Sequence, residues 1–308
     1  GQLGLGDRST RWIPTEITDA SIASKTIVDI DANGRHSLFI ADDGTVFLSG
    51  FGGNGEMGFG DSNDRLVPTE LTHANLSGVT IVEGALSMSD ANIDLHVILR
   101  SGDNRLFSFG NGTDGQLAQG DKTSNNNPTE ISASSYDNKT PVALEAGSRN
   151  TMVRMADGSL YGAGQVFTIG FDVLFFNDFP ELTPLEGDLN HRFVTDMNNT
   201  RGYGIALLDD GTVLTFGALG IGIPSYYGSL GNGEPKPSDQ RTPTEVENFN
   251  VLSSPIPTTN LALHLDAGKG FTQSGDTISV WANLAGSQNA FENMATNRPQ
   301  VAHNVINN

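Results

Sequence analysis

The sequence contains no cysteine, and this absence excludes several kinds of chemistry. Disulfide bonds, thiol nucleophiles, thiolate zinc sites and iron–sulfur clusters all require that residue. The chain also lacks any apolar run of the roughly 18 residues that a membrane span needs. Basic residues are scarce: 17 Lys and Arg stand against 36 Asp and Glu, which gives a formal net charge of -19. Because nucleic-acid binding needs clustered Lys and Arg, we expect no nucleic-acid partner, and we expect no membrane insertion.

The acidic excess admits two interpretations. The simpler one is that the charge keeps the protein soluble in a salty or extracellular setting. The sharper alternative is a surface that attracts divalent cations or a cationic partner. No pair of carboxylates stands out for glycosidase chemistry, and solvation of the surface accounts for most of them.

Two short phrases recur along the chain and indicate an internal repeat. The first has the form Gly-Gln-Leu-Gly-x-Gly-Asp and begins at Gly1, Gly55 and Gly115, with a weaker copy at Gly228. The second, Pro-Thr-Glu, begins at Pro14, Pro68, Pro128 and Pro243, and Pro184 lies near the middle of the longest gap. The first three copies of Pro-Thr-Glu lie 54 and 60 residues apart.

Each repeat also holds a segment that predicts a β-hairpin. Short apolar runs flank an Asp-Gly turn at Asp42–Thr45, Asp157–Gly158 and Asp209–Gly211, with Ser101–Asn104 as a variant. Glycine accepts positive φ without steric cost, which suits such turns. No stretch shows a helical period of 3.6 residues. The sequence therefore predicts an all-β chain with central hairpins near residues 36–50, 96–110, 151–164 and 204–217.

The linked phrases, the hairpins and the Gly34-Arg35-His36 segment resemble the regulator of chromosome condensation repeat family. That resemblance covers roughly residues 1–250 and implies a seven-bladed β-propeller. We expect about four complete blades of the seven here. The missing blades are expected upstream, because a different module begins directly after the last Pro-Thr-Glu phrase and the propeller must therefore finish near residue 250. The family's histidine position holds His36, and His96, Asn150 and Gly204 stand there in the later repeats. Between Gly164 and Pro184 the glycine phrase is absent, and the Phe-rich segment 166–179 stands in its place.

The composition of the sequence changes near residue 250, which predicts that the chain has three parts. Residues 1–249 form the partial propeller, residues 250–260 a Pro- and Ser-containing linker, and residues 261–308 a second module. The second module is similar to the start of laminin-G-like, concanavalin-A-like jelly-roll domains of secreted bacterial proteins, carried by Leu261–Ala267 and the Trp281 segment. We expect it to be truncated at the C-terminus. Calcium is the one cofactor that this resemblance allows, and no other is expected.

No catalytic, cofactor-binding or metal-ligating residue emerges from the sequence, and the binding residues stay unassigned. The six histidines (36, 73, 96, 191, 264 and 303) lack metal-ligand spacing, and His36 is expected to be a structural residue of its blade. Trp12 and Trp281 are expected in the core. Neither a nucleotide-binding glycine loop nor a Gly-x-Ser-x-Gly elbow is present.

The leading functional hypothesis is a non-enzymatic binding or adhesion scaffold. It would be monomeric within a large secreted or surface-attached bacterial multidomain protein and recognise protein or glycan through propeller loops. Two alternatives stay open. One is the family's founding activity, guanine-nucleotide exchange combined with chromatin binding. The other is a set of targeting modules for an extracellular enzyme whose catalytic domain lies outside this sequence.

Overall fold

A computed structural model describes most of the first 250 residues and two short strands beyond them. The described residues are 1–53, 55–87, 95–165, 178–186, 189, 192–200, 203–217, 240–250, 281–284 and 287–290. The chain forms two compact units, Gly1–Phe249 and Asn250–Asn308. Residues 251–260 of the expected linker, most of the expected jelly-roll start, and the segment 166–177 lie outside the described residues, so the predictions made for them are not tested.

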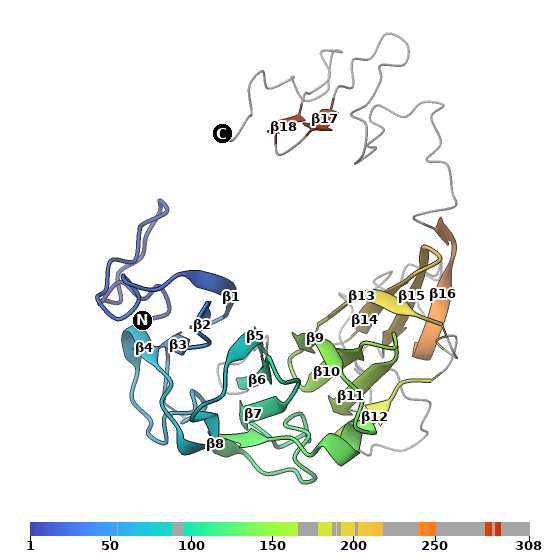
Figure 1. Ribbon diagram of the computed structural model, residues 1–308, viewed down its shortest axis with the longest axis horizontal. Helices are drawn as coiled ribbons and strands as arrows, with labels where there is room; N and C mark the ends of the chain where they lie inside the picture. The colour runs from blue at the N-terminus through green and yellow to red at the C-terminus, as the bar shows by residue number, and fades with distance from the viewer. Residues whose placement is uncertain are drawn as a thin grey trace, which may run out of the picture. The chain divides into compact units, whose positions relative to one another are not determined.

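The first unit contains four antiparallel sheets of four strands, and in each sheet the strands follow chain order (Figure 1). Sheet 1 comprises β1 (Ile27–Asn33), β2 (His36–Ala41), β3 (Val46–Gly50) and β4 (Arg65–Glu70). Sheet 2 comprises β5 (Ile81–Leu86), β6 (His96–Ser101), β7 (Leu106–Gly110) and β8 (Asn125–Glu130). Sheet 3 comprises β9 (Pro141–Ala146), β10 (Asn150–Met155), β11 (Leu160–Gly164) and β12 (Phe179–Pro184). Sheet 4 comprises β13 (Val194–Asn199), β14 (Tyr203–Leu208), β15 (Thr212–Gly217) and β16 (Gln240–Asn250).

The predicted all-β class is confirmed, and so are the four central hairpins. The second and third strands of every sheet pair in antiparallel register on either side of the predicted turns. Gly44 has φ +83° in the first turn, and Asn104 with φ 67° takes the glycine's place in the second. Short 3₁₀ helices, η1 (Ala74–Leu76) and η2 (Ala133–Tyr136), follow the outer strands of sheets 1 and 2.

The Pro-Thr-Glu phrase forms the outer strand of a sheet. Thr69 of β4 pairs with Leu48, and Thr129 of β8 pairs with Ser108. In sheet 3 the corresponding residue is Thr183, which pairs with Gly162. Pro184, which lies near the middle of the longest gap between the phrases, therefore aligns with the glutamate of the phrase and not with Pro68. Leu182 occupies the position of that proline and is buried there. Either residue fits, because strand pairing needs no backbone N–H at this position on the outer edge of the sheet.

The sheets lie side by side in chain order, with the inner strands β1, β5, β9 and β13 in contact one after another. Apolar side chains fill each seam. Between sheets 1 and 2 the core contains Leu38, Ile40 and Leu48 from one side and Leu99, Phe107 and Phe109 from the other. A second core joins sheets 2 and 3, and a third joins sheets 3 and 4. No single sheet could shield both of its faces, so the packing of neighbours supplies the core of the unit.

The glycine phrases join neighbouring sheets. The Gly1–Gly6 loop lies on β4, where the backbone N–H of Gly6 donates to Leu66 O at 2.9 Å. The Gly115–Gly120 loop lies on β12 in the same way, through a bond of 2.8 Å from Gly120 N to Pro180 O. Between them, the loop that holds Gly55 and Gly60 lies against Asn126 and Asn127 of β8. Each phrase therefore ties its own repeat to the outer strand of the next one.

The second unit is described only at one hairpin. Its strands β17 (Trp281–Leu284) and β18 (Ser287–Ala290) pair in antiparallel register. A single hairpin does not distinguish a jelly roll from other β folds, so the assignment of this unit stays a prediction.

Candidate functional site

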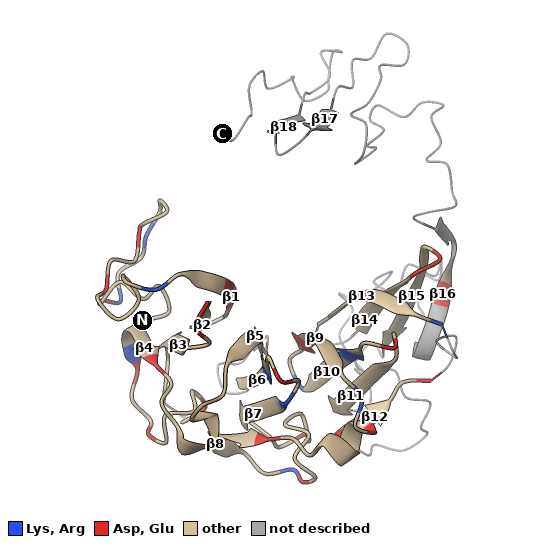
Figure 2. Ribbon diagram, viewed as in Figure 1, with Lys and Arg blue, Asp and Glu red and all other residues tan. Residues whose placement is uncertain are grey.

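The inner strands carry a row of acidic residues at matching positions. Each inner strand has a bulge near its start, and the residue after it is Asp29 in β1, Glu83 in β5, Ala143 in β9 and Asp196 in β13. Two residues further on, the matching positions hold Asp31, Ala85, Glu145 and Asn198. Figure 2 shows acidic positions on the described inner strands. Five carboxylates thus occur at two repeated positions, which we call the inner acidic row.

Three of these carboxylates hold neighbouring sheets together. Asp29 Oδ2 accepts from the backbone N–H of Gly84 at 3.1 Å, and Asp31 Oδ2 accepts from that of Leu86 at 2.6 Å. Glu83 Oε1 accepts from Leu144 N at 2.9 Å. Hydrogen bonds to a charged acceptor contribute about 1.5–3 kcal/mol each. The inner acidic row is therefore partly structural, because it satisfies amides that no strand pairing reaches.

Glu145 lies among like charges. Its carboxyl is half-buried, and burial raises its pKa to about 7, with further contributions from the negative charges of Asp31, Asp196 and Glu83. A hydrogen bond with Asn198 acts in the opposite direction. Near neutral pH this group is therefore protonated in a large fraction of molecules.

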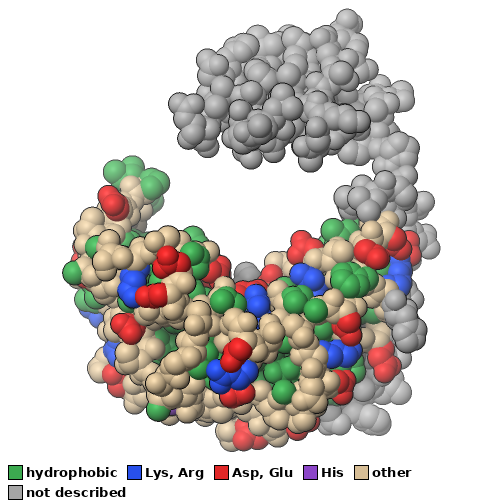
Figure 3. All heavy atoms as spheres, viewed as in Figure 1, with side chains coloured by type: hydrophobic (Ala, Val, Ile, Leu, Met, Phe, Trp, Pro, Cys, Tyr) green, Lys and Arg blue, Asp and Glu red, His purple; other side chains and the backbone are tan. Residues whose placement is uncertain are grey.

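Arginine offsets part of this charge. Arg100 Nε donates to Glu83 Oε2 at 2.7 Å, and Arg154 occupies the matching place on β10. Asp196 is exposed, whereas the other four carboxylates of the row are half-buried, so Asp196 is the one most accessible to a partner. Elsewhere, Figure 3 shows acidic, basic and apolar side chains intermixed on the visible face of the described residues.

The histidines of the sheets are structural, as predicted for His36. His36 pairs with Gly50, and its Nε2 lies 2.7 Å from Phe51 O. His96 fills the same place opposite Gly110, with Nε2 at 2.9 Å from Thr151 Oγ1. Burial lowers the pKa of both imidazoles, to about 4 for His36 and about 3 for His96, so both rings are neutral at physiological pH. Asn150 takes the position in sheet 3 as predicted, but in sheet 4 Tyr203, not Gly204, faces the terminal glycine.

Trp12 is not a core residue, contrary to the sequence prediction. Its side chain is 91% exposed, and that of the neighbouring Ile13 is 74% exposed. The segment that holds them is not paired with any described strand, so no described strand covers their apolar surface. Trp281 lies in β17, and His191, His264 and His303 lie outside the described residues.

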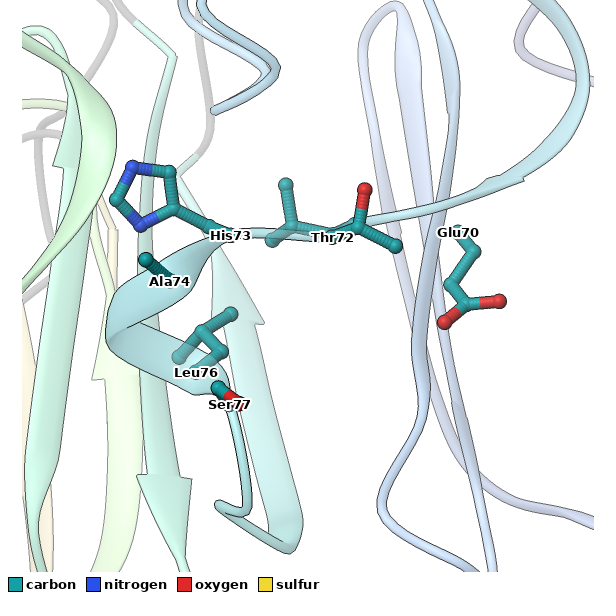
Figure 4. A pocket seen from close by; sticks show the side chains of 7 residues that line it. Glu70, Thr72, His73, Ala74, Leu76 and Ser77 are labelled. Carbon is teal, nitrogen blue, oxygen red and sulfur yellow. The ribbon is translucent and has the colours of Figure 1, made fainter.

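A surface cavity of about 470 Å³ lies beside η1, after the outer strand of sheet 1. Figure 4 shows Glu70 and His73 on opposite sides of Thr72, with the two side chains directed apart. His73 Nδ1 accepts from Asn75 N at 3.2 Å, which leaves the Nε2 nitrogen to carry the proton. The lining combines one carboxylate and one imidazole with two leucines and three small side chains, and the carboxylate and imidazole do not form an acid–base pair.

Within the described ranges, no group of three or more His, Asp or Glu side chains is placed to hold a metal ion. In the same part of the chain, no helix has the length and apolar character needed to cross a membrane. Sequence reasoning assigned the carboxylates to solvated surface and missed the inner acidic row. The signal was present as an acidic residue two positions after an Ile or Val that begins the inner strand, at Asp29, Glu83 and Asp196.

Comparison with known proteins identifies the repeat. The family model described as the regulator of chromosome condensation (RCC1) repeat matches residues 103–154. The ultraviolet-B receptor UVR8 of Arabidopsis thaliana is 31% identical over 164 residues, which cover 53% of this chain and 34% of UVR8. The human E3 ubiquitin-protein ligase HERC2 is 30% identical over 172 residues, which cover 55% of this chain and 3% of HERC2. The chain thus spans about a third or less of these curated relatives.

Solved structures agree on the fold. Human WBSCR16 matches with a TM-score of 0.62 at 22% identity, over 79% of this chain and 60% of that one. Prp20p of Saccharomyces cerevisiae, the yeast RCC1, matches with a TM-score of 0.59 at 20% identity, over 73% of this chain and 51% of that one. The four sheets therefore have the fold of an RCC1-type repeat β-propeller. The number of blades in a complete ring stays a prediction.

Proposed function

We propose that the propeller unit is a protein-binding scaffold that receives a basic segment of its partner on the inner acidic row. The observation that carries this proposal is the recurrence of carboxylates at matching positions of successive inner strands, with Asp196 exposed and Asp31 half-buried. Clustered negative charge attracts cationic ligands, and attraction weakens as salt rises. The formal net charge of -19 adds a field of the same sign.

The fold supports this class of function. Prp20p, whose fold this unit shares, is described by its binding properties to Gsp1p and histones. Histones are basic proteins, and a carboxylate-lined surface suits such a ligand. Glycan recognition, an extracellular or cell-surface location and the jelly-roll neighbour remain further parts of the hypothesis. Fractionation of cells that produce the intact protein tests the location.

The test uses the purified chain and a fluorescent oligolysine peptide, with a Gly-Ser peptide as the neutral control. The double variant Asp31→Asn, Asp196→Asn should weaken oligolysine binding several-fold at low salt and flatten its salt dependence. The matched control is Asp42→Asn, Asp209→Asn, which removes the same charge from two exposed turn residues outside the row. Equal losses in both double variants would mean that only net charge matters, and the proposed site would be rejected.

A second candidate function is nucleotide exchange on a small GTPase, which the similarity to Prp20p favours. Release of a fluorescent guanine nucleotide from candidate GTPases tests it. Stimulation above the rate without the chain would support an exchange factor, and an unchanged rate would count against one.

A further inference from the structure

The hairpin turn of each of the four sheets carries an aspartate that pairs with a basic residue. The four ion pairs join Lys25 with Asp43, Arg105 with Asp103, Lys139 with Asp157 and Arg192 with Asp210. In sheets 2 and 4 the arginine also contacts the glutamate of the Pro-Thr-Glu phrase. Arg105 Nη1 lies 3.4 Å from Glu130 Oε2, and Arg192 Nη1 lies 3.8 Å from Glu245 Oε2. In these two sheets one guanidinium therefore joins the turn to the outer strand.

Sheet 1 has both carboxylates but lacks this arginine. Lys25 Nζ lies 2.5 Å from Asp43 Oδ2, whereas Glu70 forms no hydrogen bond or ion pair with any residue that the structure describes. The hydrogen bond with Asp43 is the main cause that raises the pKa of Lys25, and the negative charge of Glu70 adds to it without contact. Sheet 3 also lacks the arginine, but there Pro184 stands in the place of the glutamate. Sheet 1 therefore keeps the glutamate without the arginine that contacts it elsewhere.

A cavity of about 150 Å³ lies where that arginine would be. It borders the larger cavity beside η1, because Glu70, Leu71 and Leu76 line both. Thr45 also lines it and holds the turn position of Arg105, since the backbone oxygen of each accepts the same turn-closing hydrogen bond at 2.9 Å. Figure 4 shows Glu70 on one side of this region and Leu76 on the other. The space thus has a carboxylate on one wall and an apolar side chain on the opposite wall.

Smaller side chains account for this cavity. Counted from the glutamate of each Pro-Thr-Glu phrase, Leu76 corresponds to Tyr136 of the next repeat. Val79, which also lines the cavity, corresponds in the same way to Lys139. Tyr136 is buried, and the ammonium of Lys139 takes part in an ion pair, so both side chains occupy space in their repeat. With Thr45 in the arginine position, three matching positions around sheet 1 hold smaller residues.

We propose that this cavity binds the guanidinium of an arginine side chain presented by a partner protein, between the carboxylates of Glu70 and Asp43. A water molecule occupies about 30 Å³ of liquid, so the space equals about five waters, enough for a planar guanidinium and the last carbons of its stem. The donors of a guanidinium form a rigid fork that can contact two carboxylates, whereas the ammonium of lysine is a compact point charge. Leu76 and Val79 contact the carbon stem.

The local charge favours a cation although Lys25 is close by. Asp43, Glu70 and Asp42 all raise the pKa of Lys25, so three carboxylates face one ammonium. Lys25 stays bound to Asp43 and leaves Glu70 to the incoming guanidinium. None of these residues belongs to the inner acidic row, so this site does not depend on the function proposed above.

The test follows the methyl resonances of Leu76 and Val79 by NMR in the purified full chain. The probe is the end-blocked peptide Gly-Ser-Arg-Ser-Gly, and the same peptide with lysine in place of arginine is the comparison. The arginine peptide should shift these resonances in a saturable manner and bind several-fold more tightly than the lysine peptide. Equal affinities would show that charge alone is recognised and would overturn the proposal, and so would the absence of a shift.

Two variants and a matched control locate the binding. Glu70→Gln should weaken binding of the arginine peptide several-fold. Thr45→Arg should prevent it, because a guanidinium of the chain itself then fills the cavity as in sheet 2. The control is Glu130→Gln, which removes the same charge from a glutamate that Arg105 already contacts and should bind the peptide as the unchanged chain does. Equal losses in Glu70→Gln and Glu130→Gln would overturn the proposal.

Two further measurements define the ligand and its place. Free arginine that gives the full shift where the peptide gives none would make the ligand a small molecule and overturn the proposal of a protein partner. The double variant Asp31→Asn, Asp196→Asn should bind the arginine peptide unchanged, which separates this test from that of the inner acidic row. A loss of the Leu76 and Val79 shifts in that variant would contradict the assignment to this cavity.

Discussion

Glu145 links the stability of the unit to pH through one half-buried carboxyl. Its pKa of about 7 in the folded state exceeds its ordinary value of 4.5. Between these two values the folded state binds more protons than the unfolded state, so the free energy of unfolding falls as pH rises. Below about pH 4.5 the carboxyl is protonated in both states and contributes no such dependence.

Replacing Glu145 with Gln should remove this dependence. We expect the Glu145→Gln variant to gain about 1 kcal/mol in the free energy of unfolding at pH 8 and almost nothing at pH 5. The gain is smaller than the pKa shift alone implies because water reaches the carboxyl. Urea unfolding at both pH values measures it. Glu16→Gln, which removes the same charge from an exposed side chain, is the control, and an equal gain in that variant would contradict the local explanation.

Single residues were predictable from the sequence where the repeat fixed their surroundings. His36 and Asn150 occupy the expected strand position because the terminal glycine of the hairpin lies opposite each of them. Trp12 was misplaced because burial depends on which distant segments pack against a side chain, and no local pattern encodes that. Glu145 could not have been singled out either, since its charged neighbours come from three other inner strands.

At the scale of one strand, the end of β3 depends on a glycine. Gly50 has φ +134°, and a Cβ there would lie 2.1 Å from Arg35 O on the neighbouring strand connection. The Cβ of an alanine at this position would force the two backbone segments apart. The positive φ of the position is also unfavourable for any residue with a side chain. The same close approach recurs at Gly110 and Gly164, so the strand ends of the sheets share one steric requirement.

We expect Gly50→Ala to lower the free energy of unfolding by more than about 3 kcal/mol, since strain and a backbone clash act together. Gly78→Ala is the matched control, because Gly78 also has positive φ (+72°) but no atom lies within 4 Å of its Cβ position. That control should cost about 1 kcal/mol, from conformation alone. Thermal unfolding of the two variants measures the difference, and similar melting temperatures would contradict the steric account.

The sequence predicted the strands and hairpins more accurately than it aligned the outer strands of the repeats with one another. Alternating apolar residues around Asp-Gly turns identify a hairpin by local chemistry alone. The outer strand of sheet 3 was harder to align, because β12 forms the same strand as the Pro-Thr-Glu phrase although Leu182 replaces the proline. Spacing along the sequence pointed to Pro184, which lies two residues beyond the structural counterpart of Pro68.

At the scale of the whole propeller unit, stability resides in the seams between sheets. Ile98 of β6 and Ile205 of β14 occupy the same position in their sheets, each pairing with the residue two places before the terminal glycine of the third strand. Ile98 is buried in the core between sheets 2 and 3, and Ile205 is 39% exposed. The same residue type thus lies inside the core between two sheets at Ile98 and outside such a core at Ile205.

We expect Ile98→Ala to lower the free energy of unfolding by about 3 kcal/mol, because it opens a cavity in the core. Ile205→Ala should cost less than about 1 kcal/mol. Chemical denaturation of both variants measures the contrast. Equal costs would show that burial between described sheets is not the source of stability.

The carboxylate bonds of the inner acidic row run from β1 to sheet 2 and from β5 to sheet 3, and no described strand pairs one sheet with another. Under mechanical tension between Gly1 and the end of β16, the load would cross these seams one after another. Each rupture would release one sheet and leave the others folded. A force–extension trace of the unit would then rise and fall in successive steps of similar length, where a molecule with one continuous sheet would give a single large event.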